Sequence, residues 1–361
     1  MDSSFPPSDP LSVPTVLPPL WSGLDGCYDP EGLAIDCRGT WQDADLRPGL
    51  AWPEPRFEPA GDGIVLDRLT GLCWSSSANP FSFPMTWEEG LRSVAAWNAH
   101  AHLGRTDWRM PNRVELRSIV SHGARKPALP KGHPFRDVFL GWVWSSTSAA
   151  IAPTHAWRVH LEGGRTFYGR KVEESLVWPV AGTSAVLPRS GQTLCYDAKG
   201  GEIACTALAA GQDGGLGLGG AWPKPRFAEP EDGGEGVLDR LTGLVWARLA
   251  DQARSGDAPG LTDWAGALAL AAEARERSGL PWRLPAITEL ESLVDCSRAE
   301  PALPGGHPFA HPGEAYWSAT SSYYGPDWAY CLYLHKGAVG VGYKPGPEFL
   351  VWLVRSLPSP A

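Results

Sequence analysis

The chain has 361 residues, enough for two or three domains. Glycine and proline make up 77 of them and tryptophan another 18, whereas charged residues are only 20%, a composition typical of a loop-rich globular protein with short strands. The formal net charge of −9 argues against a nucleic-acid-binding protein, and no run of 18 uninterrupted apolar residues is present to insert into a membrane.

Residues 1–22 are rich in proline and poor in charge. We expect them to form an extended, flexible lead-in. They contain no basic start followed by an apolar run, so a secretory signal is not predicted in this segment.

From residue 23 onward the sequence is a tandem repeat. Cys27-Tyr28-Asp29 returns as Cys195-Tyr196-Asp197, and later motifs return with an offset that grows from 168 to 174. Insertions in the loops of a constant scaffold produce such a drift. The predicted units are a first repeat at 23–182 (Cys hairpin 23–60, domain 61–182), a linker at 183–190 and a second repeat at 191–356 (hairpin 191–232, domain 233–356).

Each repeat opens with two cysteines ten residues apart, flanking a turn. Asp29-Pro30-Glu31-Gly32 has the residues that a type I turn prefers. If the flanking strands pair in register, the expected disulfides are Cys27–Cys37 and Cys195–Cys205. Such bridges favour an oxidising compartment; four reduced thiols are the alternative. The other cysteines, Cys73, Cys296 and Cys331, have no repeat counterpart, and a Cys296–Cys331 bridge stays open.

The remainder of each repeat contains two helices followed by strands. A capping box at Thr86–Glu89 predicts a helix to about residue 100, and Thr262 opens its equivalent. Asn112-x-x-Glu115 caps a second helix to about residue 121, whereas its counterpart has Ala286 at the capping position.

The late strands alternate between apolar and polar residues. In 157–161, Trp157, Val159 and Leu161 are expected to face the core, and 330–334 is expected to present the same faces. Because strands cluster after the helices rather than alternating with them, the fold class is α+β rather than doubly wound.

Four repeated motifs resemble one family, over about residues 23–356. They are Asp-x-x-Thr-Gly-Leu-x-Trp (67–74; 239–246), Trp-Arg-x-Pro-x-x-x-Glu-Leu-x-Ser (108–118; 282–292), a Trp-Ser strand (144–146; 317–319) and Val-Trp-x-Val (177–180; 351–354). This pattern resembles the Lcl C-terminal domain family, in two tandem copies. The resemblance implies C-type-lectin-like domains of bacterial surface or secreted proteins. The adhesin that names the family binds sulfated glycosaminoglycans, and related folds serve as display scaffolds with variable loops.

No catalytic motif is present. The chain lacks His-Glu-x-x-His, Gly-x-Ser-x-Gly and a Walker-type loop, and the glycines at 215–220 precede no helix. His133 and His307 are expected to be structural, bonding to loop carbonyls. We therefore expect a non-enzymatic protein; an enzyme like the formylglycine-generating relatives of this fold would need Cys296 and Cys331 as a reactive pair.

No cofactor or metal is expected. The triplets with which C-type lectins hold calcium are missing, and His100 and His102 point to different faces of a helix. Calcium stays an alternative, because the acidic turns at 61–63 and 232–236 offer oxygen ligands.

A basic segment stands out at 105–136. It contains eight Lys and Arg against two acidic residues, a net of +6, whereas the matching window 279–310 has two against four, a net of −2. Arginine suits bidentate binding of sulfate or carboxylate, so we expect a patch for an acidic glycan. The patch residues are Arg109, Arg113, Arg117, Arg125 and Lys126; the alternative is a solvated face, with Arg109 tied into the core because Arg283 repeats it.

A second candidate surface lies late in repeat two and is rich in tyrosine. Rigid aromatic rings spaced by glycine are typical of recognition loops and stack on sugar rings. Its residues are Tyr323, Tyr324, Tyr333, His335, Tyr343 and Lys344; the alternative is that several of the tyrosines complete the core.

The sequence thus predicts an adhesion-type binding protein for a glycan or a protein. The alternatives are a structural or assembly subunit of a cell-surface complex, and a display scaffold. The cysteine pairs favour an extracellular, cell-surface or periplasmic location, and a cytoplasmic one stays open. The sequence does not determine the oligomeric state.

Overall fold

The computed structural model describes residues 16–206, 211–256 and 258–357. The first 15 residues of the predicted lead-in lie outside these ranges. Residues 16–22 are described, and here the expectation of a flexible segment is not met: Leu17 is buried, and its amide donates to the carbonyl of Leu241 at 2.7 Å. Leu20 pairs with Leu50 in an isolated bridge, so the segment is held against both repeats.

Each repeat contains a four-stranded antiparallel sheet that joins its beginning to its end. The strands of repeat one, in sheet order, are β3 (Phe57–Pro59), β4 (Ile64–Asp67), β5 (Cys73–Ser75) and β9 (Val180–Ala181). Those of repeat two are β12 (Phe227–Ala228), β13 (Val237–Asp239), β14 (Leu244–Trp246) and β18 (Val354–Ser356).

The helices and the remaining strands lie between these sheet strands in the chain. Repeat one has α2 (Trp87–Ala99), the 3₁₀ turn η1 (His102–Gly104), α3 (Arg113–Ser118), β6 (Trp142–Ser148), β7 (His155–His160) and β8 (Thr166–Arg170). Repeat two has α5 (Trp264–Ser278), α6 (Ile287–Ser292), β15 (Ala315–Ser321), β16 (Trp328–Tyr333) and β17 (Ala338–Tyr343). This order agrees with the predicted α+β class and two repeated domains.

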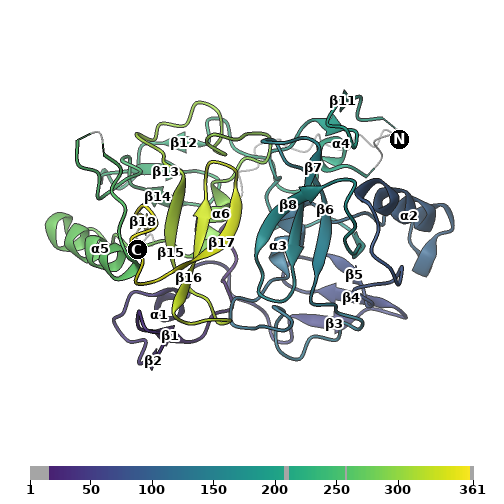
Figure 1. Ribbon diagram of the computed structural model, residues 1–361, viewed down its shortest axis with the longest axis horizontal. Helices are drawn as coiled ribbons and strands as arrows, with labels where there is room; N and C mark the ends of the chain where they lie inside the picture. The colour runs from purple at the N-terminus through teal and green to yellow at the C-terminus, as the bar shows by residue number, and fades with distance from the viewer. Residues whose placement is uncertain (1–15, 207–210, 257, 358–361) are drawn as a thin grey trace, which may run out of the picture.

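The two repeats share one central sheet. Its strand order is β15-β16-β17-β8-β7-β6, and the repeats meet where Val339 of β17 pairs with Thr166 of β8. Figure 1 shows the two strand triplets side by side at the centre, with α5 and α2 at opposite ends of the molecule. The repeats are therefore related by an approximate twofold arrangement around the β17–β8 junction.

The two Cys hairpins pack on the opposite repeat. Their elements are β1 (Cys27–Tyr28), β2 (Ala34–Ile35) and α1 (Asp43–Leu46) in the first, and β10 (Cys195–Tyr196), β11 (Glu202–Ile203) and α4 (Asp213–Leu216) in the second. Helix α1 contacts β15 of repeat two, whereas α4 contacts β6 of repeat one (Figure 1). Both predicted disulfides are present, with S–S distances of 2.12 and 2.01 Å.

A buried carboxylate fixes each exchanged hairpin. Thr320 donates to Asp43 at 2.5 Å, and Thr147 donates to Asp213 at 2.7 Å. Burial raises the pKa of each aspartate to about 6, although the hydroxyl donors oppose this shift. A hydrogen bond between a threonine and a buried aspartate of the opposite repeat therefore holds each of the two hairpins.

The helix ends follow from local capping. Thr86 and Glu89 form the predicted capping box of α2. The equivalent helix α5 begins later than expected, since Asp263 rather than Thr262 caps it by accepting from the Gly266 amide at 2.7 Å. Asn112 caps α3 as predicted, but this helix ends at Ser118.

The central strands of repeat two are more buried than the alternation predicted. Trp157 and Val159 of β7 face the core as expected, with the Arg158 side chain only partly covered. In β16, however, Cys331 is fully buried although it was expected on the outer face. No helix in the described part of the chain is both long and apolar enough to cross a bilayer.

Candidate functional site

Arg109 belongs to the core of repeat one. Its guanidinium is buried and pairs with Glu115, which also accepts from the Asn112 amide at 2.9 Å. Repeat two contains the same unit, in which Arg283 and Glu289 lie 2.6 Å apart. Arg109 therefore does not contribute to a surface patch, in agreement with the alternative that its repetition suggested.

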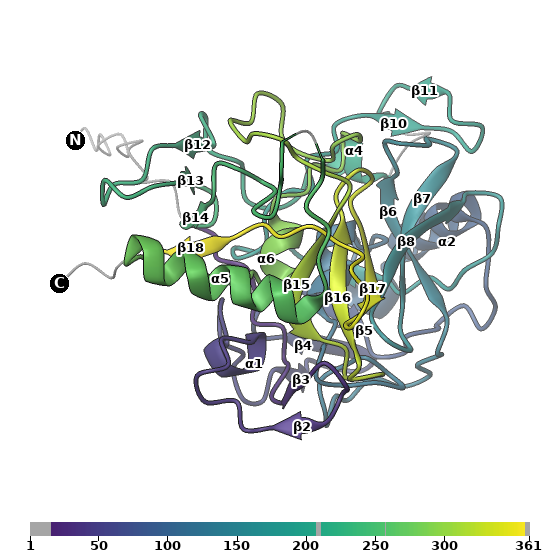
Figure 2. The same cartoon turned by 60° about the vertical axis from the view of Figure 1, so that its left-hand side comes forward.

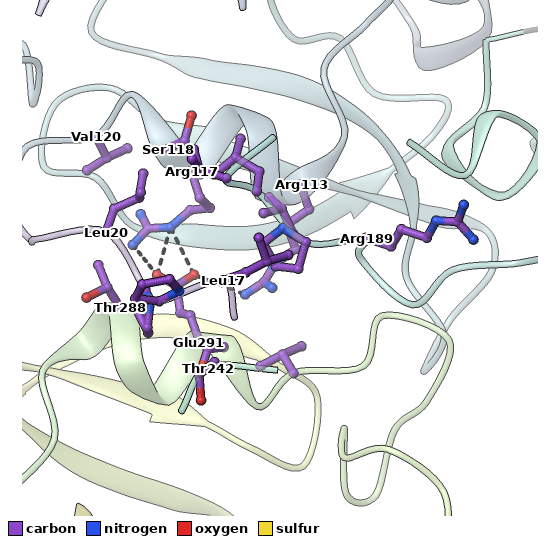
Figure 3. A pocket seen from close by; sticks show the side chains of 18 of the residues that line it. Leu17, Leu20, Arg113, Arg117, Ser118, Val120, Arg189, Thr242, Thr288 and Glu291 are labelled. Carbon is purple, nitrogen blue, oxygen red and sulfur yellow. Dashed lines mark hydrogen bonds and ion pairs between the residues drawn. The ribbon is translucent and has the colours of Figure 1, made fainter. Parts of the chain in front are cut away.

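Arg113 and Arg117 lie at the boundary between the repeats. Both bind Glu291 of α6, Arg117 at 2.6 Å and Arg113 at 3.3 Å (Figure 3). Burial alone would raise the pKa of Glu291, but the two guanidinium groups lower it below its usual value. Because these arginine side chains are less than a tenth exposed and already paired, the structure does not place them on the surface where the sequence analysis expected them.

A small apolar cavity of ≈ 100 Å³ adjoins this cluster. Leu17 and Leu20 of the N-terminal segment cover it, and Val120 and Thr288 contribute its walls (Figure 3). Its position indicates that the N-terminal segment completes the contact between the repeats.

The two predicted surfaces meet at a different place. The Arg125 guanidinium donates to the Tyr324 carbonyl at 3.0 Å and lies 5.7 Å from the Tyr323 ring centroid. The Lys126 ammonium lies 5.2 Å from the Tyr324 ring and 3.5 Å from a carboxylate oxygen of Glu162. A loop of repeat one and a loop of repeat two thus form one aromatic and cationic cluster, which neither repeat could form alone.

This cluster borders a surface cleft. One part has a volume of ≈ 350 Å³ and is lined by Arg125, Lys131 and Tyr323. An adjoining part of ≈ 540 Å³ is lined by Trp52 and Trp21, and residues 130–133 line both parts. Neither Arg125 nor Lys131 forms an ion pair with any residue that the structure describes. Two exposed cations therefore lie beside the Tyr323 ring in the smaller part, whereas the larger part also carries the exposed carboxylates of Asp25 and Glu54; we call the whole surface the 121–133 cleft.

The approximate twofold arrangement places a second, similar region on the other side of the molecule. The positions equivalent to Arg125, Lys131 and Tyr323 are Ala299, Gly305 and Ala150. These three side chains therefore have no counterpart at the equivalent positions, although the exposed Arg298 of repeat two lies beside Gly305 and supplies a different cation there.

The remaining candidates of repeat two are dispersed. Lys344 is fully buried: its ammonium donates to the carbonyls of Tyr28 and Asp29, at 3.4 and 3.0 Å, and lies 4.1 Å from the Trp264 ring. Burial lowers its pKa to about 8, opposed by nearby carboxylates. Lys344 thus holds the first hairpin, and Lys171 holds the second through the carbonyls of residues 196 and 197.

The other three residues are on or near the surface, away from the cleft lining. Tyr343 is exposed and packs beside Trp328 at 5.5 Å between ring centroids. Tyr333 is half-buried against Phe349, and His335 approaches the Tyr333 ring at 6.4 Å. The tyrosines are therefore divided between a surface role and completion of the core.

The sequence analysis missed Trp52, Trp21 and Lys131 as site residues. Lys131 was counted in the basic window, and Trp52 belongs to the repeated Trp-Pro-x-Pro-Arg-Phe arm, so a signal existed for both. What the sequence could not indicate is that the arm folds against loop 121–133 to form a cleft.

The cysteines outside the hairpins are reduced. Cys296 and Cys331 are buried and form no disulfide, so the bridge that was left open does not form. Burial raises the pKa of both thiols to about 12. Within the described ranges, no group of three or more His, Cys, Asp or Glu side chains is placed to hold a metal ion.

His133 and His307 occupy equivalent positions beside Phe135 and Phe309. The expected hydrogen bond to a loop carbonyl is not made through Nδ1, because this buried atom has no partner among the described residues in either case. The conserved feature of the two rings is packing against the neighbouring phenylalanine, at 5.7 and 5.8 Å between centroids.

Comparison with known proteins supports the repeat structure. A search of curated proteins gave no match to the chain. The model of the Lcl C-terminal domain matches residues 63–181 and 235–355, which together make up more than half of the chain. The chain therefore belongs to the Lcl C-terminal domain family and carries two copies of that domain.

Proposed function

We propose that this protein is a non-enzymatic, C-type-lectin-like binding protein that recognises an acidic glycan in the 121–133 cleft. The observation that carries the proposal is that Arg125 and Lys131, neither of which forms an ion pair with a described residue, line the smaller part of the cleft together with the Tyr323 ring. Sugar rings stack on aromatic faces, and sulfate or carboxylate groups accept charge-assisted hydrogen bonds from guanidinium and ammonium groups. Family membership in a lectin-like, binding-type domain supports the same class of function.

The raised pKa of the two buried thiols supports a binding rather than an enzymatic role. A thiol becomes a nucleophile by losing its proton, and burial keeps Cys296 and Cys331 protonated at neutral pH. The two disulfides support an extracellular or periplasmic location.

The experiment is retention of the protein on immobilised heparin, as a sulfated polysaccharide probe, over a series of salt concentrations. We expect Arg125→Glu with Lys131→Glu to weaken binding at least about tenfold, because two charge-assisted contacts become repulsive. The matched control is Lys199→Glu with Lys224→Glu, which changes the net charge equally on exposed residues of repeat two. Equal loss of binding in both variants would show a nonspecific charge effect and refute the site.

A protein partner is the second candidate, favoured by the exposed ring pair of Trp328 and Tyr343. Aromatic residues of this kind are enriched in protein interfaces. Sedimentation at increasing concentration tests whether that surface assembles copies of the chain. Heparin binding by a monomer whose size does not change with concentration favours the glycan proposal instead.

A further inference from the structure

The first hairpin supports a ring of the 121–133 cleft. Tyr323 lines the smaller part of the cleft, and its side chain packs against a buried cluster of this hairpin. The cluster consists of Leu24, Cys27 and Ala44. Cys37 packs against the same cluster. The Cys27–Cys37 disulfide therefore belongs to the apolar support of the Tyr323 side chain.

The Tyr28 side chain gives the first hairpin a second contact with the cleft. Burial raises the pKa of the Tyr28 phenol, and Tyr323 and Asp25 raise it further, whereas Arg125 lowers it. The phenol is thus coupled to Tyr323 and Arg125, which both line the smaller part of the cleft. Because the Arg125 guanidinium lies 5.7 Å from the centre of the Tyr323 ring, the hairpin, the ring and the cation form one connected group.

The start of the first hairpin also lines the larger part of the cleft. Gly23 and Asp25 contribute to its wall. A Cβ atom at Gly23 would lie 2.3 Å from the Trp52 ring and 2.9 Å from the Ser121 hydroxyl, so the backbone of the hairpin directly contacts two other parts of the wall. Asp25 is exposed, and its carboxylate favours placing the anionic group of a ligand in the smaller part instead.

Few hydrogen bonds hold the first hairpin closed. Its strands β1 and β2 have two residues each, and only two residue pairs are in register, with Cys27 opposite Ile35. A disulfide that closes such a short loop restricts the open conformations of the chain. Cys27 is buried and Cys37 is partly exposed, so a thiolate in solution is expected to attack the bridge at the Cys37 sulfur.

The second hairpin offers a matched comparison. Its disulfide, Cys195–Cys205, spans the same sequence separation of 10. The position equivalent to Tyr323 is Ala150, and no described residue of 191–232 lines either part of the cleft. Figures 1 and 2 both show the hairpins on opposite sides of the molecule, with α1 and β2 on one side and α4 and β11 on the other. An effect on the cleft is therefore expected from the first disulfide alone.

We propose that the Cys27–Cys37 disulfide is a redox switch for the glycan site, a role that rests on the function proposed above. Tyr323 contacts the ligand, and the two cysteines are positioning residues that act through it. Reduction loosens the hairpin and the Tyr323 ring, so a smaller fraction of the protein is competent to bind. Hydrogen bonds from Thr320 and Lys344 still attach the reduced hairpin to repeat two, so the chain stays folded.

The reductant is a dithiol. One of its thiolates attacks the Cys37 sulfur, which breaks the S–S bond, forms a mixed disulfide and releases Cys27 as a thiolate that takes up a proton. The second thiolate of the reductant then attacks the reductant's own sulfur in the mixed disulfide and displaces Cys37, which is also protonated. Two electrons and two protons pass to the protein, and the dithiol becomes a disulfide.

The test measures binding of the full chain to immobilised heparin by surface plasmon resonance at neutral pH and fixed salt. The variant Cys195→Ser with Cys205→Ser keeps only the first bridge. We expect dithiothreitol to weaken its binding at least about threefold, and reoxidation to restore it. The variant Cys27→Ser with Cys37→Ser keeps only the second bridge and is expected to bind as weakly as the reduced protein, with no response to dithiothreitol.

A double-mutant cycle separates positioning from a general loss of stability. Tyr323→Ala is expected to weaken heparin binding and to remove most of the effect of reducing the first bridge, because that effect passes through the Tyr323 ring. An effect of reduction that is equally large with and without the ring overturns the proposal.

Hydrogen exchange in residues 322–325 provides a readout that needs no ligand. Faster exchange there after reduction of the first bridge, but not of the second, is expected. If the oxidised protein does not bind heparin, the glycan function fails even where this exchange responds. Heparin binding that does not respond to the first bridge, or that responds equally to both bridges, overturns the switch alone. If Cys27→Ser with Cys37→Ser does not fold, reversible reduction of the variant with only the first bridge decides.

Discussion

The contact between the repeats depends on one carboxylate serving two buried arginines. Replacing Glu291 by Gln keeps the shape of the side chain but leaves Arg113 and Arg117 as uncompensated charges. Removing one partner of a buried ion pair typically costs about 3–5 kcal/mol. We expect the free energy of unfolding to fall to this extent, at the upper end, because two cations lose their partner.

The assay is urea unfolding followed by both far-UV circular dichroism and tryptophan fluorescence, so that separate unfolding of the repeats is detected. The control is Glu229→Gln, which breaks an exposed pair with Arg248 and is expected to change stability by less than about 0.5 kcal/mol. A second control replaces Glu291, Arg113 and Arg117 by Met together, which is expected to recover most of the loss, since no charge is then left buried. A loss below about 1 kcal/mol in Glu291→Gln would refute the reasoning.

Three further predictions concern the hairpins and the thiols. Burial raises the folded-state pKa of Asp43 and Asp213 to about 6, so the protonated carboxyls contribute stability below about pH 4 that is lost as the pH rises through 6. We expect this contribution to be about 2–3 kcal/mol per residue, and the pH profile of stability to be flatter in the double variant Asp43→Asn with Asp213→Asn. A pH profile unchanged by these substitutions would contradict the prediction. Reduction of the two hairpin disulfides is expected to destabilise each hairpin by about 2–3 kcal/mol, and hydrogen exchange should then show faster exchange in the hairpins than in the central sheet. An aromatic disulfide reagent is expected to modify the partly exposed Cys73 in the folded protein and to leave Cys296 and Cys331 unmodified. Equal modification of all three thiols before unfolding would refute the burial of Cys296 and Cys331.

The local structure followed from the sequence because its signals are local. Thr86 and Glu89 specify the start of α2, and the two cysteines flanking a Pro-Glu-Gly turn specify a hairpin with a disulfide. The repeated motifs specified the family, because both copies retain them. Each of these depends on residues within about ten positions of one another.

The packing of each hairpin on the opposite repeat could not be predicted from the sequence. The spacing between equivalent motifs is the same whether a hairpin contacts its own domain or the other one. Thr147 and Thr320, which donate to the aspartates, lie in serine- and threonine-rich strands and have no distinguishing signal in the sequence. Only the fold shows that each binds the aspartate of the other repeat.

The basic patch was wrongly placed for a related reason. The matching windows of the two repeats have net charges of opposite sign, and Arg117 and Glu291 occupy the same position of the repeat. In an arrangement with approximate twofold symmetry, equivalent positions near the axis face one another, so opposite charges there form a pair. The charge difference between the two windows that suggested a ligand therefore arises in part from this internal ion pair. Arg125 and Lys131, farther along the chain, are exposed and form no ion pair with a described residue.

The exchange of hairpins has a consequence for how the sequence can change. Asp43 and Thr320, or Asp213 and Thr147, are partners that lie in opposite halves of the chain. The same is true of Lys344 and the carbonyls of residues 28 and 29, and of Lys171 and the carbonyls of residues 196 and 197. The two halves together have the arrangement of a symmetric dimer whose subunits have been joined end to end. A substitution on either side of such a contact therefore changes the fit between the two halves of the chain.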